Sequence, residues 1–329
     1  MFNNRQIAIA QFCLYNISED FMKILYITKN TRNEQFPWLI DYQDDSLLIG
    51  LKEHFGTDVV DINRKHNIYT DYSDEDVRTE YGKGFTYTRA IQDGDVDRED
   101  IHKKIRNHYF DLVVYGNVWR NLEYHDLVLQ SYEHGEIAYI DGEDNTKMHP
   151  VIKEKGMYFK RELVFENNQE FQEHLWKVCP ISFAFPTSKV NHDNRRNKIS
   201  IYDPRNKSTY VYDNETLYYQ DYQRSKYAWT MAKAGWDCAR HYEIMGNGCV
   251  PLFLDIQHCP RYIIHRGPKA LLSKIMFFYN FDQKWVEKNY DYLRGEVLDH
   301  FVNFNTTKML AKYFLKDIDY TKNGFRPEV

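Results

Sequence analysis

Short apolar runs alternate with amphipathic segments from residue 22 onward. Ile24–Thr28 is apolar, and Asp44–Phe55 carries its leucines and its phenylalanine at a helical spacing. Gly56 would end that helix, and Asp58–Ile62 is the next apolar run. The same alternation predicts helices at Glu99–Asn107 and Leu122–His134 and strands at Asp111–Tyr115 and Ile137–Ile140. Strands and helices that alternate in this way indicate an α/β fold with a parallel, doubly wound sheet.

A second series of alternating segments begins near Lys177. It predicts strands at Val178–Phe185, Ile199–Tyr202, Tyr227–Thr230 and Val250–Leu254, and helices at Glu215–Ser225, Trp236–Met245, Pro268–Tyr279, Gln283–Phe304 and Lys308–Phe314. We therefore expect an N-terminal extension (1–21), an N-terminal Rossmann-like domain (22–170) and a C-terminal Rossmann-like domain with terminal helices (171–329). Because the pattern changes sharply at Met22, that residue is a candidate for the start of the fold, or of translation.

Composition narrows the classes of function. The 43 basic and 48 acidic residues give a net charge of −5, which argues against a nucleic-acid binder. Five irregularly spaced cysteines favour a reducing compartment, so we expect a cytoplasmic protein. No apolar stretch approaches the roughly 20 residues that cross a bilayer, and the first 21 residues lack the pattern of a signal peptide.

The segment from Ala234 to Asp255 carries the most specific chemistry. It places Arg240 and Glu243 three positions apart, so in a helix they share one face. A Gly-Asn-Gly turn follows, and then the apolar run that we expect to be a buried strand. An arginine and a glutamate in this arrangement can hold a diphosphate and a sugar hydroxyl together, although an ordinary surface ion pair is the common alternative.

The residues Arg-His-Tyr-Glu-Ile-Met-Gly-Asn-Gly-Cys-Val-Pro-Leu-Phe-Leu-Asp (240–255) resemble the donor-site signature of exostosin-like and related GT-B glycosyltransferases. Weaker similarity extends over Met22–Thr28 with Asp41–Asp45, Asp111–Gly116 and Tyr158–Leu163. The resemblance implies two Rossmann-like domains facing across a cleft, with the donor bound mainly by the C-terminal domain. It also implies transfer of a sugar from a nucleotide-diphosphate sugar to a hydroxyl of a glycan or glycoconjugate, without a metal or a cofactor.

The same resemblance assigns roles to single residues. Glu243 would hold hydroxyls of the donor, and Arg240 would neutralise the diphosphate as it leaves. The donor pocket would further include Tyr242, Gly246, Asn247, Gly248 and Lys226. Pro251 stands where many GT-B enzymes carry a second glutamate, which leaves open whether the transfer inverts or retains configuration.

A base for the acceptor hydroxyl is expected in the N-terminal half, if the reaction needs one. Asp45 and Asp141 are the main candidates, with Asp44 and Asp144 beside them; each is also a plausible helix cap or solvated loop carboxylate. Further basic candidates, all of which could equally be solvated, are Lys160, Arg161, Arg195 and Arg196.

Other interpretations remain at this point. Asp93-Gly-Asp95 matches the Asp-x-Asp metal motif of GT-A enzymes, but no predicted strand precedes it. Cys249, His258 and Cys259 lack the paired spacing of a zinc site. A non-catalytic carbohydrate- or nucleotide-binding protein would use the same cleft, whereas an epimerase would need a dinucleotide fingerprint that the chain lacks.

Overall fold

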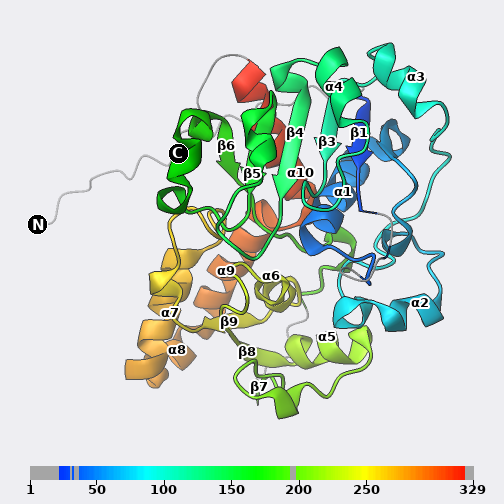
Figure 1. Cartoon of the computed structure of the whole chain (residues 1–329). Helices are drawn as coiled ribbons and strands as arrows, with labels where there is room; N and C mark the ends of the chain where they lie inside the picture. Colours follow the sequence, from blue (N-terminus) through cyan, green and yellow to red (C-terminus); the bar gives the residue numbers. More distant parts are fainter. Residues whose placement is uncertain (1–21, 30–31, 33–36, 193–197, 323–329) are drawn as a thin grey trace, which may run out of the picture.

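The computed structural model describes residues 22–29, 32, 37–192 and 198–322. Its larger sheet has six strands in the order β2-β1-β3-β4-β5-β6, and every neighbouring pair is parallel. The strands are β1 (Ile24–Ile27), β2 (Val59–Asp61), β3 (Leu112–Tyr115), β4 (Ile137–Asp141), β5 (Met157–Lys160) and β6 (Val178–Pro180). Figure 1 shows this sheet in the upper part of the molecule.

Helices cover both faces of the larger sheet. Successive residues of β1 belong to different clusters of buried side chains: Ile24 and Tyr26 pack with α1 (Tyr42–Phe55) and α10 (Thr307–Lys322). Leu25 and Ile27 pack on the other face, with α3 (Ile101–Arg106) and α4 (His125–Ser131). This alternation follows from the two-residue period of a strand, and it buries every residue of β1.

A smaller parallel sheet has the order β7-β8-β9 and lies in the lower part of Figure 1. Its strands are β7 (Lys198–Ile199), β8 (Ser225–Thr230) and β9 (Val250–Phe253). The remaining α-helices of the described chain are α2 (Asp74–Thr79), α5 (Glu215–Gln223), α6 (Ala239–Gly246), α7 (Lys269–Phe281), α8 (Gln283–Lys288) and α9 (Tyr290–Phe304).

The predicted α/β class with a parallel, helix-flanked sheet is confirmed, but single elements differ. The strand expected at Val178–Phe185 is shorter, and it pairs with β5, so it closes the first sheet instead of opening the second. β5 itself was not predicted, because only three apolar residues precede Lys160, its last residue; the lysine is buried against Asp141. The helix expected at Gln283–Phe304 is two helices, α8 and α9, separated at Asn289.

The two sheets share one cluster of buried side chains. This cluster runs from Ile24 in β1 through Phe159 in β5 to Leu252 in β9, and then back to α10. The return of α10 places the C-terminal helix against α1, where Gly50 permits the close approach. The division at residue 170 therefore stays a prediction. The extension 1–21 and the candidates Arg195 and Arg196 lie outside the described residues.

Within the described ranges, no helix combines the length and the apolar character needed to span a membrane.

Candidate functional site

Arg240 and Glu243 lie on α6, which begins after the carboxyl end of β8. In an open parallel sheet, this edge is where ligands bind. α6 begins at Ala239, three residues later than expected, because Trp236 and Asp237 are engaged elsewhere: their backbone N–H groups donate to the Glu162 carboxylate at 3.1 and 2.9 Å.

Glu243 is buried and both its carboxylate oxygens are engaged. Thr86, from the N-terminal half, donates a hydrogen bond to Oε1, and the Tyr218 hydroxyl donates to Oε2 at 2.7 Å. Burial raises the pKa of Glu243, and these hydrogen bonds and Arg240 oppose that shift. No ion pair joins Glu243 to Arg240 in the described part of the chain, so the two side chains are not the simple surface pair that the spacing also allowed.

Arg240 is enclosed by aromatic side chains. Its guanidinium lies 5.3 Å from the ring centroid of Tyr202, which follows β7. The Nη1 atom is buried and has no hydrogen-bond partner among the residues described. A guanidinium N–H group that is buried and unsatisfied is costly, so Nη1 is a candidate donor to a bound ligand.

Four tyrosines surround this pair, and we call them the tyrosine cluster: Tyr202, Tyr210, Tyr218 and Tyr222. The first two rings stack with centroids 4.5 Å apart, and the hydroxyls of the last two lie 2.8 Å apart. Sequence reasoning missed the cluster because the chain has 27 tyrosines. The only signal was the spacing of four residues between Tyr218 and Tyr222, which places both on one face of α5.

The structure does not bring the other predicted donor residues to this edge. Lys226 is near the amino end of β8, where its ammonium pairs with Glu287 at 2.6 Å. Gly246, Asn247 and Gly248 end α6 and precede β9, at the end of α6 away from Arg240. Tyr242 is fully buried, and its hydroxyl donates to Asp237 at 2.8 Å. Their roles in donor binding stay predictions.

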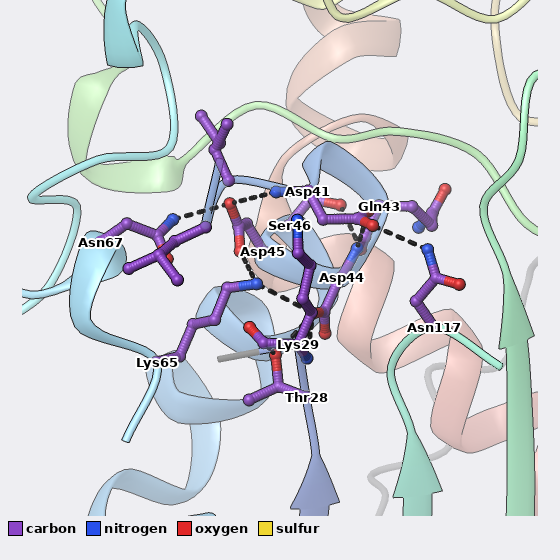
Figure 2. A network of polar contacts seen from close by, with 12 residues as sticks. Thr28, Lys29, Asp41, Gln43, Asp44, Asp45, Ser46, Lys65, Asn67 and Asn117 are labelled. Carbon is purple, nitrogen blue, oxygen red and sulfur yellow. Dashed lines mark hydrogen bonds and ion pairs between the residues drawn. The ribbon is translucent and has the colours of Figure 1, made fainter. Parts of the chain in front are cut away.

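A second polar network lies at the carboxyl end of β1 (Figure 2). Lys65 pairs with Asp44 at 3.0 Å and with Asp45 at 3.1 Å, and all three side chains are fully buried. Asn67 donates to Asp45 at 2.8 Å. Burial, reinforced by the neighbouring carboxylates and opposed by Lys65, raises the pKa of Asp45 to about 7.

Asp141 and Asp144 have different surroundings. Asp141 is fully buried at the end of β4, pairs with Lys160 at 2.8 Å and accepts a hydrogen bond from Tyr158. Asp144 is more than half exposed and pairs with Arg161. Arg161 in turn donates to the backbone oxygen of Asp237, so it links the carboxyl edge of the larger sheet to the segment before α6.

Partly exposed charges that the sequence analysis did not name as candidate bases lie at the same edge. Asp41 caps α1 and accepts a hydrogen bond from Asn117 at 2.7 Å, as Figure 2 shows. Arg120 pairs with Glu143 at 2.6 Å, and burial raises the pKa of Glu143. Asp41 and Glu143 therefore join Asp144 as carboxylates of this edge that a solute can reach.

Asp93, the first residue of the possible metal motif, is engaged by arginines. Its carboxylate pairs with Arg64 at 2.6 Å and with Arg98 at 3.1 Å. In the described ranges, no three histidine, cysteine, aspartate or glutamate side chains are grouped so as to hold a metal ion.

Two hollows lie away from the Arg240–Glu243 pair. One lies between β6 and α10 and is lined by Ser182 and His265 among others. The other is an open groove between α7 and α9, lined by Pro268 and His300 among others. Neither is lined by Arg240 or Glu243.

Comparisons of the chain with protein-family models, with curated proteins and with solved structures found no match in any of the three.

Proposed function

We propose that this chain is a glycosyltransferase that takes a nucleotide-diphosphate sugar as donor and a hydroxyl of a glycan or glycoconjugate as acceptor. The observation that carries the proposal is the buried Nη1 of Arg240, which has no hydrogen-bond partner among the described residues and lies one helical turn from Glu243. A guanidinium binds phosphate oxygens as a fork of donors, and a carboxylate accepts from sugar hydroxyls. The resemblance of residues 240–255 to the GT-B donor signature supports the same assignment.

The proposed arrangement is of the GT-B kind, with the donor at the carboxyl edge of the smaller sheet. The tyrosine cluster supplies flat apolar faces and hydroxyls beside Arg240, which suit a nucleoside and a sugar. As the nucleoside diphosphate leaves, negative charge develops on its phosphates, and a fixed cation in a water-poor site stabilises that charge most effectively.

The acceptor is proposed to bind at the carboxyl edge of the larger sheet. Asp41, Glu143 and Asp144 have partly exposed carboxylates there, whereas Asp45 and Asp141 are fully buried in ion pairs. If a base is used, we therefore expect Asp41, Glu143 or Asp144 to contact the acceptor, and the buried Asp45 and Asp141 to make no contact with it.

The test is donor binding followed by transfer. A thermal-shift screen of nucleotide-diphosphate sugars should give a clear hit, and Arg240→Ala and Glu243→Ala should each abolish turnover of that donor while circular dichroism stays unchanged. Lys284→Met and Glu166→Gln, which change exposed side chains elsewhere, are the matched controls. Full activity in both alanine variants would overturn the site, and a screen without any hit would overturn the donor class.

The second candidate is a non-catalytic carbohydrate- or nucleotide-binding protein. The observation that favours it is the full engagement of Asp45 and Asp141, the two carboxylates first expected to provide a base. Slow hydrolysis of the donor in the absence of acceptor would favour the enzyme. Tight glycan binding without any affinity for nucleotides would favour the binding protein.

A further inference from the structure

A loop from the N-terminal half makes a hydrogen bond to Glu243, the carboxylate that is predicted to bind the donor. We call residues 82–90 the Thr86 loop. Thr86 is 1% exposed, and its hydroxyl donates to Glu243 while accepting a hydrogen bond from the Tyr219 hydroxyl at 3.0 Å. Because Tyr218 holds the other carboxylate oxygen, the hydroxyls of the protein fill the positions that hydroxyls of a ligand would take.

The backbone of the Thr86 loop is strained. Thr86 has a φ of +76°, which a β-branched residue rarely adopts, because its Cβ then crowds the backbone. Lys83 and Arg89 also have positive φ, at +60° and +53°. Backbone strain of this kind persists only where the surrounding contacts impose it, and it is concentrated in ligand clamps and switch regions.

The contacts that impose this conformation come from the rest of the chain. The Lys83 ammonium donates to the backbone oxygen of Tyr212, and the Lys189 ammonium donates to the backbone oxygen of Thr88 at 3.1 Å. The Tyr87 hydroxyl donates to the backbone oxygen of Ala184 at 2.8 Å. The Thr86 backbone N–H also donates to Glu215, and Tyr87 is fully buried. Contacts with several distant segments therefore hold the loop in place, and its opening must break them.

We propose that the Thr86 loop is a gate over the donor site, and that its Thr86 hydroxyl leaves Glu243 when a sugar or ribose hydroxyl of the donor takes its place. The inference rests on the proposed function, because it takes Glu243 as the carboxylate that binds the donor. When the loop opens, release of the backbone strain at Thr86 offsets part of the free energy lost with the hydrogen bond to Glu243. The exchange is therefore reversible. The gate is open in only a fraction of the molecules, so the apparent affinity for the donor is the affinity of the open form multiplied by that fraction.

Substitution of Thr86 tests the gate by calorimetric titration with UDP-glucose and GDP-mannose as probes. Thr86→Ala removes the competing hydroxyl, and we expect it to bind the donor about tenfold more tightly than the wild type. Thr86→Ser keeps the hydroxyl and should bind no more tightly than the wild type. Thr79→Ala, on exposed α2, removes a hydroxyl that donates only within its own helix and is the control. Equal or weaker binding by Thr86→Ala would overturn the gate.

Hydrogen exchange of the wild-type chain tests the gate without any substitution. We expect amides 85–88 to exchange faster than those of β9 in the free protein, and faster still when the bound probe is added. Amides 85–88 that become more protected on binding would overturn the gate while leaving the proposed function intact. If neither the wild type nor Thr86→Ala binds any nucleotide-diphosphate sugar of the thermal-shift screen, the proposed function fails. Amides 85–88 as slow as those of β9 would then overturn the gate by themselves.

Discussion

At the scale of single residues, the immediate neighbours of a buried carboxylate determine its pKa. Three aspartates of the α1 entrance, Asp41, Asp44 and Asp45, share the region with one fully buried lysine, Lys65. Burial, reinforced by the charges of Asp44 and Asp41 and opposed by Lys65, raises the pKa of Asp45 to about 7. In the unfolded chain an aspartate has a pKa near 3.9, so the folded protein binds this proton more tightly.

This raised pKa predicts a pH dependence of stability. A carboxyl group whose pKa is higher in the folded state stabilises the fold fully below the unfolded pKa, and that contribution disappears as pH rises through the folded pKa. We therefore expect the free energy of unfolding of the wild type, relative to Asp45→Asn, to fall between pH 4 and pH 7. Urea melts at several pH values measure this difference, with exposed Asp95→Asn as the control. Parallel pH profiles of the wild type and Asp45→Asn would contradict the assignment.

At the scale of elements, the packing of α1 against α10 depends on one glycine. A Cβ atom at Gly50 would lie 2.1 Å from the backbone oxygen of Thr307 and 3.2 Å from the Cβ of Ala311. The first contact is with backbone, so the helices would have to separate. Gly295 of α9 is the opposite case, because a Cβ there meets nothing within 4 Å.

Substitution of these two glycines by alanine should change the stability of the protein in opposite directions. Gly50→Ala should destabilise the protein by about 1–3 kcal/mol through overpacking. Gly295→Ala should stabilise it by about 0.5–1 kcal/mol, because alanine loses less conformational freedom than glycine in a helix. Denaturant unfolding of both variants against the wild type measures the two changes. A neutral Gly50→Ala would show that α10 does not pack on α1 as closely as described.

The sequence predicted the elements whose signal is local, and missed those that depend on distant partners. β1 and β3 are apolar runs at the expected positions, and α1 was found from its spacing. β5 was missed, since Lys160 is buried only because Asp141 of β4 pairs with it. In the site, Arg240 and Glu243 were found from one short motif. Thr86 was out of reach of that reasoning, because its contact with Glu243 joins the two halves of the chain.

At the scale of the whole molecule, one cluster of buried side chains joins both sheets, and α10 returns to the first sheet after the second is complete. Polar contacts reinforce the connection: the Glu162 carboxylate, after β5, accepts from the backbone of the segment before α6. A shared core of this kind couples the unfolding of its parts, since neither sheet can expose its apolar face without exposing that of the other.

We therefore expect both sheets to unfold in one transition, although chains of this length often show intermediates. The six tryptophans divide evenly between the halves, with Trp38, Trp119 and Trp176 before the smaller sheet and Trp229, Trp236 and Trp285 within or after it. Two variants, each keeping one set and carrying phenylalanine at the other three positions, report separately on the two halves by fluorescence. In each variant, we expect the urea midpoint measured by fluorescence to coincide with the midpoint measured by circular dichroism. A fluorescence midpoint in either variant that departs from that curve would show that the halves unfold independently, and would restore the division near residue 170 as a thermodynamic boundary.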